Sequence, residues 1–230
     1  MDRLGLYLLG PNDTLENGIY TGDARELASA IPDESVDLIF TDPVYDRIDD
    51  YRWLAETASR VLKPRGIVLV CFGIGYLPET LQALNHGLMT YRWTMGAFQP
   101  NGPSRRGVAR GFSKWWGCLW IDKKGDSLPP GHFPDMVQSI AGTGWPGAHQ
   151  WRKNPAPFIS WLRAFAGPGE IVFDPFTGGG TVPAVCKMLG RRYLAFEIVP
   201  ATAQDARDRV RQTQPPLFVP KPEQMGLVLD

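Results

Sequence analysis

The chain has 230 residues, of which 43% are hydrophobic and 21% charged, and its formal net charge is zero. This composition is ordinary for a soluble globular protein, and a neutral total neither requires nor excludes a polyanionic partner. No uninterrupted apolar run approaches the ~20 residues that a membrane span needs. No signal-peptide pattern follows Met1, so we expect a cytoplasmic protein without a membrane anchor.

The cysteines and histidines do not show the spacing of a disulfide framework or of a metal site. Cys71, Cys118 and Cys186 are odd in number and lie far apart in apolar surroundings, which favours buried, reduced thiols. The three histidines lack metal-ligand spacing as well. We therefore expect no bound metal.

The first half of the chain predicts alternating strands and helices. A short strand at 18–21 is followed by a helix at 24–31, which Asp23 is placed to cap. The apolar run 36–40 predicts a strand buried on both faces, and an acidic loop is expected at 46–50. The later expected elements are a helix at 51–62, a strand at 67–72, a helix at 78–87, and an antiparallel strand pair at 91–98 and 115–121.

Two long segments, 99–114 and 126–148, are rich in Gly and Pro and lack clear periodicity. Loops of this length inside a compact domain are usually functional or disordered. The remaining expected elements are a helix at 155–165, a strand at 170–173, a helix to 189, a strand at 192–198, a helix at 200–211 and a poorly ordered tail at 214–230. No linker or repeat divides the chain, which indicates one α/β domain over residues 1–230.

A carboxylate, a proline and an aromatic residue follow the strand at 36–40. In an open α/β sheet, ligands bind where the carboxyl ends of the strands meet the loops. Asp42 can accept a hydrogen bond from an amine, Pro43 fixes the backbone, and Tyr45 offers a flat face for stacking on a base. The plainer interpretation is a strand followed by an Asp-Pro turn. A second motif downstream favours the first interpretation.

Residues 174–197 predict a strand–helix–strand unit with a glycine turn after its first strand. Gly178 and Gly180 let the backbone approach a ligand closely, and the following helix offers its N-terminal N–H groups. Glu197, at the end of the next strand, can bind a ribose diol. The turn lacks both the G-x-G-x-x-G spacing of dinucleotide sites and the lysine of a phosphate-binding loop. This pattern favours a cofactor that contains adenosine but no pyrophosphate.

These two segments resemble motifs of the S-adenosylmethionine-dependent amino-methyltransferases of DNA. The run from Phe173 to Thr181 is similar to their cofactor motif DPFxGxGT. Thr41-Asp42-Pro43-Val44-Tyr45 resembles their catalytic (D/S)PPY, with Val44 in place of the second proline. The catalytic motif precedes the cofactor motif, which is the order of the family's β class.

Three shorter matches extend the resemblance over about residues 18–211. Residues 149–155 are similar to the family's H-x-W-x-K-P segment, with Asn154 standing before the proline. Residues 190–197 match its GR…(G/F)E continuation, and Gly22-Asp23 lies where the family has a GD pair near the cofactor adenine. The joint occurrence of these motifs in one order is more specific than any one of them.

The resemblance implies a Rossmann-like, mostly parallel seven-stranded sheet with an antiparallel strand pair, helices on both faces and a permuted methyltransferase order. It implies S-adenosylmethionine as the cofactor, and base flipping, since a base inside a duplex must leave the stack to be modified. It assigns catalysis to Asp42, Pro43 and Tyr45. It assigns cofactor binding to Asp23, Thr41, Asp42, His149, Lys153, Asp174, Phe176, Gly178, Gly180, Thr181 and Glu197.

The family's usage favours N6 of adenine as the methyl acceptor, because cytosine-N4 members more often carry serine in place of Asp42. Cytosine N4 stays open as the alternative. RNA adenine methyltransferases usually end the catalytic motif in tryptophan rather than tyrosine, and protein-glutamine methyltransferases carry it after the cofactor loop. A different class, a catalytically silent nucleic-acid-binding subunit, would be indicated by loss of Asp42 or of the glycine turn, and both are present.

Target recognition is expected in the segments 99–114 and 126–148. The first contains a local excess of positive charge that suits phosphate or guanine contacts, formed by Arg105, Arg106, Arg110 and Lys114. The expected partner is double-stranded DNA, and so small a recognition region makes a homodimer a reasonable expectation. The recognition sequence and any restriction-enzyme partner stay open.

Overall fold

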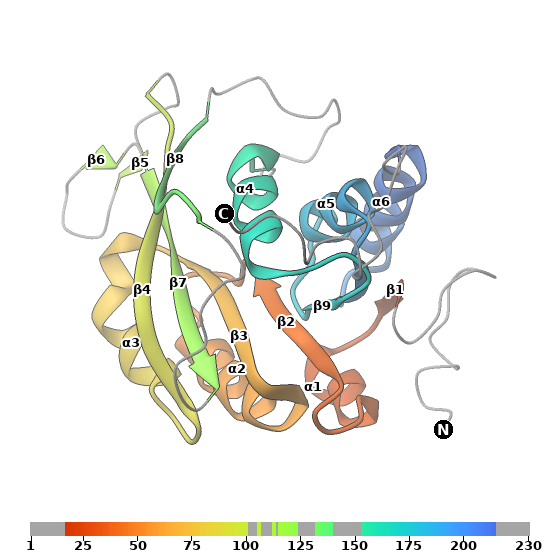
Figure 1. Ribbon diagram of the computed structural model, residues 1–230, viewed down its shortest axis with the longest axis horizontal. Coiled ribbons are helices and arrows are strands. Elements are labelled where there is room, and N and C mark those ends of the chain that lie inside the picture. Colours follow the sequence, from red (N-terminus) through yellow and green to blue (C-terminus); the bar gives the residue numbers. More distant parts are fainter. Residues whose placement is uncertain are drawn as a thin grey trace, which may run out of the picture.

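An eight-stranded sheet forms the centre of the computed structural model (Figure 1), which describes residues 17–100, 105–106, 112–113, 115–123, 132–139 and 153–214. The strands, in spatial order, are β1 (Asn17–Thr21), β10 (Arg192–Glu197), β9 (Ile171–Asp174), β2 (Val36–Thr41), β3 (Leu62–Phe72), β7 (Trp115–Lys123), β4 (Met89–Phe98) and β8 (Met136–Gln138). Within this sheet β7 runs antiparallel to both of its neighbours, and the other pairs are parallel. The mostly parallel sheet with an antiparallel strand pair is thus confirmed.

Helices cover both faces of the sheet, as expected. On one face lie α1 (Ala24–Leu27), α2 (Ile48–Val61) and α3 (Leu77–Leu84). On the other lie α4 (Pro155–Phe165), α5 (Thr181–Leu189) and α6 (Pro200–Gln212). The 3-10 turns η2 (Ala28–Ala30) and η3 (Ile74–Tyr76) follow α1 and β3. Among the described residues, no helix has both the length and the apolarity that crossing a bilayer requires.

The central strand β2 shows why its sequence is continuously apolar. Leu38 and Phe40 pack into the layer that contains α4, α5 and α6. Ile39 packs into the layer on the other side, with α1, α2 and α3. A parallel strand that is covered on both faces needs apolar side chains at successive positions rather than at alternate ones.

Several expectations about the elements need correction. The predicted loop at 46–50 is wrong in part, because α2 begins at Ile48 and has Asp49 and Asp50 in its first turn, where acidic side chains favour the helix dipole. The helix expected at 24–31 divides into α1 and η2 and ends at Ala30, because Ile31 is extended before Pro32. Two short strands, β5 (Arg105–Arg106) and β6 (Phe112–Ser113), pair within the segment expected to be a loop. The sheet has eight strands rather than seven because β8, inside 126–148, pairs with β4.

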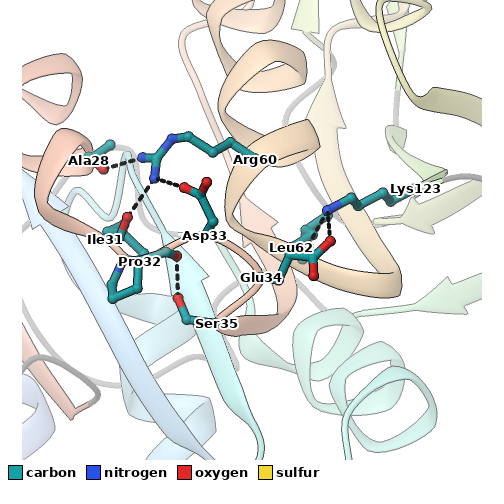
Figure 2. A network of polar contacts seen from close by, with 9 residues as sticks. All are labelled: Ala28, Ile31, Pro32, Asp33, Glu34, Ser35, Arg60, Leu62 and Lys123. Atoms are coloured by element: carbon teal, nitrogen blue, oxygen red, sulfur yellow. Dashed lines mark hydrogen bonds and ion pairs between the residues drawn. The ribbon is translucent and has the colours of Figure 1, made fainter.

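A polar network fixes the turn that leads into β2 (Figure 2). Arg60, on α2, donates hydrogen bonds to the carbonyl of Ile31 at 2.6 Å and to the carboxylate of Asp33 at 2.8 Å. Lys123, on β7, donates to the carbonyl of Leu62 at 2.5 Å. The Arg60 contacts hold the turn before β2 against α2, and the Lys123 contact ties β7 to the start of β3.

Candidate active site

A cavity of about 580 Å³ lies at the carboxyl ends of β1, β10, β9 and β2. From β9 the chain continues to β10 on one side, whereas from β2 it continues to β3 on the other, so the direction of strand succession reverses between β9 and β2. Ligands of open α/β sheets bind at such a reversal, and the volume lies in the range of small-molecule sites. The predicted site residues that line this cavity are Asp23, Asp42, Pro43, Tyr45, Lys153, Asp174, Phe176, Gly178, Thr181 and Glu197.

A buried hydrogen bond joins the predicted catalytic motif to the predicted cofactor motif beside the cavity. The hydroxyl of Thr41 donates to Oδ1 of Asp174 at 2.7 Å, and the backbone N–H of Phe176 donates to the same oxygen at 3.3 Å. Burial raises the pKa of Asp174 to about 7, although both hydrogen bonds favour the charged form. Asp174 therefore titrates near neutral pH at the base of the cavity.

The glycine turn brings backbone to the edge of the cavity. Gly178 and Gly180 have φ of +49° and +76°, in the left-handed region that glycine adopts readily. A Cβ atom on Gly180 would lie 2.8 Å from Cβ of Ala206, whereas one on Gly178 would meet open space. Gly180 is also the N-cap of α5, so the first turn of that helix follows directly. Backbone at Gly178 and Gly179 and the first helical residue, Thr181, therefore border the cavity.

The ends of β10 and β1 form the opposite wall. The backbone N–H of Gly22 donates to the carbonyl of Glu197 at 3.0 Å and ties the two strand ends together. Oε1 of Glu197 accepts from the N–H of Val199 at 2.8 Å. Oδ1 of Asp23 accepts from the N–H of Arg25 at 2.8 Å, so this carboxylate caps α1 as expected while also lining the cavity.

The part of the cavity at the carboxyl end of β2 contains Asp42, Tyr45 and a lysine. The Lys153 ammonium lies 2.5 Å from Oδ1 of Asp42 and also donates to the Tyr45 hydroxyl. The Lys153 side chain is only 8% exposed, against 29% for that of Asp42. The Tyr45 ring packs on Gly73, where a Cβ atom would lie 2.7 Å from Cδ2 of the tyrosine.

A second wall of the cavity was missed by reasoning from the sequence. Arg25 and Asp50 form an ion pair of 2.7 Å between α1 and the first turn of α2. Arg25 lies 5.7 Å from the Trp53 ring centroid, and that ring meets the Phe176 ring edge-on at 5.6 Å. The usable sequence signal was the pair of acidic residues before an apolar helical pattern, which typically marks a first helical turn.

Several predicted residues cannot be assigned a place in the site. His149, Arg110 and Lys114 lie outside the described residues, as do the side chains of Arg105 and Arg106.

The three cysteines are free and buried, as expected.

Comparison with known proteins gives matches along most of the chain. The DNA methylase family model matches residues 101–208, and a general methyltransferase-domain model matches residues 10–70. The type II methyltransferase M.HpaI of Haemophilus parainfluenzae is 24% identical over 236 residues, which cover 85% of this chain and 74% of that protein.

Solved structures share the fold at low sequence identity. The crystal structure of the M1.HpyAVI–SAM complex matches with a TM-score of 0.72 and 22% identity, covering 84% of this chain and 98% of that chain. The cytosine-N4-specific PvuII DNA methyltransferase matches with a TM-score of 0.74 and 20% identity, covering 85% of this chain and 86% of that chain.

Proposed function

Because this chain belongs to the N6/N4 family of S-adenosylmethionine-dependent DNA amino-methyltransferases, we propose that it methylates N6 of an adenine flipped out of duplex DNA. The observation that carries this proposal is the hydrogen bond from Thr41 to Asp174, which joins the catalytic and cofactor motifs at one cavity. A methyl donor and an acceptor amine can then meet within a single site, and orientation of that kind is a large part of enzymatic rate enhancement.

The residues present fit S-adenosylmethionine. The left-handed glycines leave room for backbone N–H groups to approach the methionine end, and Asp174 offers a carboxyl group there. Glu197 would bind the ribose of the cofactor and Asp23 would lie near its adenine ring, and both residues line the cavity. When bound, S-adenosylmethionine supplies an electrophilic methyl group on a positively charged sulfur. The proposed part of His149 in this site rests on the family resemblance.

The catalytic residues would prepare the acceptor nitrogen. An exocyclic amine is a poor nucleophile because its lone pair is delocalised into the ring. The Asp42 carboxylate and the Pro43 carbonyl would accept hydrogen bonds from its two N–H groups and favour a tetrahedral nitrogen, with the lone pair directed at the methyl group. Tyr45 would stack on the base. Asp42 would then take the proton that the methylated nitrogen loses.

The choice of base rests on Asp42 at the head of the catalytic motif. The second candidate is N4 of cytosine, which presents an amine of the same chemistry, and the PvuII enzyme with that specificity shares the fold. The segments 99–114 and 126–148 are proposed to read the DNA, with Arg105, Arg106, Arg110 and Lys114 on phosphates or guanines. A homodimer would enlarge this small recognition surface.

Nucleoside mass spectrometry after incubation with S-adenosylmethionine and unmethylated duplex DNA tests the proposal. We expect N6-methyladenine from the wild-type protein and a loss of at least about 100-fold in Asp42→Ala, since general acid–base catalysis alone contributes about that much. Asp49→Ala is the matched control, because that aspartate is 86% exposed on α2. N4-methylcytosine would reverse the choice of base, and no methylated base would point to a silent binding subunit.

A further inference from the structure

The position of Lys153 calls for a role that the family resemblance does not give. The resemblance places this lysine among the cofactor-binding residues, yet its ammonium contacts Oδ1 of Asp42 at 2.5 Å and the hydroxyl of Tyr45. The ammonium also lies 4.2 Å from the centroid of the Trp116 ring, at cation–π distance. All three contacts are at the catalytic end of the cavity.

Local structure fixes Lys153 in this position. Asn154 is the N-cap of α4, and its Oδ1 accepts from the N–H of Ala156 at 2.9 Å, with Pro155 as the first helical residue. Asn154, which departs from the family's motif, therefore starts the helix. One turn on, the Phe158 ring stacks on Phe40 of β2 at 5.0 Å. The start of α4 is thus anchored to the strand that carries Asp42.

The Asp42–Lys153 pair presents an acceptor and a donor side by side. An ammonium group has three N–H donors, and Asp42 and Tyr45 engage two of them among the contacts of the described residues. Adenine carries an amine donor beside the unprotonated N1, and cytosine carries one beside the unprotonated N3. Guanine and thymine carry a carbonyl acceptor beside a ring N–H. The donor and acceptor of the pair are therefore complementary to amino bases and not to keto bases.

We propose that Lys153 is a specificity-determining residue that donates a hydrogen bond to the unprotonated ring nitrogen next to the target amine. This inference rests on the proposed function and holds for either amino base. A keto base would bring its carbonyl to the Asp42 carboxylate and its N–H to the Lys153 ammonium, leaving buried polar groups without partners. Sites of this kind discriminate strongly, because the unpaired groups stay desolvated.

Replacing the ring nitrogen by C–H tests the proposal directly. Duplexes carry either deoxyadenosine or 1-deazadeoxyadenosine at the mapped target position, or deoxycytidine and 3-deazadeoxycytidine if the product is N4-methylcytosine. Single-turnover methylation is measured for the wild-type protein and for Lys153→Met. We expect the wild type to lose about 10- to 100-fold on the deaza base, as for a hydrogen bond to a charged group, and Lys153→Met to be nearly indifferent to the replacement.

Two further variants control the comparison. Lys63→Met removes a lysine from another lysine–aspartate ion pair, 2.6 Å from Asp37 at the opposite end of β2, and is expected to keep the wild-type ratio. Lys153→Arg keeps a charged donor and is expected to restore part of the dependence on the ring nitrogen. If Lys153→Met does not fold, the Lys153→Arg variant replaces it in the comparison with the wild type.

The outcomes separate this inference from the proposed function. A wild-type protein that methylates DNA but ignores the ring nitrogen would overturn the role of Lys153, as would a Lys153→Met variant with the wild-type ratio. A tenfold loss of S-adenosylmethionine affinity in Lys153→Met, measured by calorimetry with the ratio intact, would make Lys153 a cofactor ligand instead. Absence of any methylated DNA base would refute the function itself, and the Lys153 role would fall with it.

Discussion

At the scale of single residues, burial and hydrogen bonding have opposite effects on the pKa of Asp174 in the ligand-free protein. It is 3% exposed at the floor of the cavity, where the Thr41 hydroxyl and the Phe176 N–H point at one of its oxygens. These donors favour the carboxylate, but burial outweighs them and raises the pKa to about 7. A cationic group arriving beside Asp174 would reverse that balance and stabilise the charged form.

The stability of the ligand-free protein is therefore expected to fall as the pH rises. The folded pKa of Asp174 lies above the ordinary value of 3.8. Its contribution is complete below about pH 4 and is lost as the pH rises through 7. Between pH 5 and pH 8 the wild type should lose about 2–3 kcal/mol of unfolding free energy relative to Asp174→Asn. Urea denaturation of both proteins at the two pH values measures this, and a constant difference between them would contradict it.

At the scale of elements, the turn between β9 and α5 depends on two glycines in different ways. Gly178 and Gly180 both have positive φ, but only Gly180 lies against another helix, at Ala206 of α6. Gly178 is required only for its positive φ. Gly180 is required for its positive φ and also because a side chain there would keep α5 and α6 apart.

Gly180→Ala and Gly178→Ala form a matched pair that separates these two effects. Left-handed strain is expected to destabilise Gly178→Ala by about 1–2 kcal/mol. Gly180→Ala adds overpacking against Ala206, and we expect a total of about 3 kcal/mol and weaker S-adenosylmethionine binding. Chemical denaturation and calorimetry measure the two quantities. Equal destabilisation in both variants would show that the contact with Ala206 is relaxed at little cost.

Elements with strong local patterns could be predicted from the sequence. The helix at 155–165 has the predicted bounds, and the buried strand at 36–40 is one residue longer than expected. Strands of two or three residues, such as β8, could not be predicted, because their pairing depends on tertiary neighbours rather than on periodicity. The start of α2 was missed because its first turn is acidic and looked like a loop.

In the cavity, too, residues placed by local sequence patterns could be predicted, whereas contacts that depend on tertiary packing could not. The side chains of Asp42, Asp174 and Glu197 follow strand ends, so that parallel strands bring them to one edge of the sheet. The contact between Lys153 and Asp42 depends on how α4 packs on β2 through Phe158, which no local pattern encodes. The Arg25–Asp50 ion pair likewise depends on two helices meeting.

At the scale of the whole molecule, the charge is neutral in total but uneven along the chain. Residues 99–124 contain six basic residues and a single acidic one, Asp122. Binding to DNA releases counterions in proportion to the phosphates that are neutralised, whatever the net charge of the protein. The basic segment is therefore expected to set the salt dependence of DNA binding.

Replacing Arg105, Arg106, Arg110 and Lys114 by glutamine tests this expectation. The slope of log affinity against log salt concentration should flatten by up to about 3.6, which is about 0.9 for each phosphate that the variant no longer neutralises. Fluorescence anisotropy over a range of salt concentrations measures the slope. Arg52 and Arg211, 55% and 73% exposed on α2 and α6, give a control pair of glutamine substitutions. An unchanged slope in the fourfold variant would place the DNA elsewhere.

The bond between Thr41 and Asp174 spans 133 positions of the chain, and this separation has a consequence for the protein while it is being made. Thr41 and Asp42 leave the ribosome before Asp174 and the glycine turn have been synthesised. An unfinished polypeptide that stops before residue 174 therefore carries the predicted catalytic motif without the predicted cofactor motif. A product that ends before residue 174 is therefore expected to lack methyltransferase activity. Methylation is thus expected only after most of the chain has been synthesised.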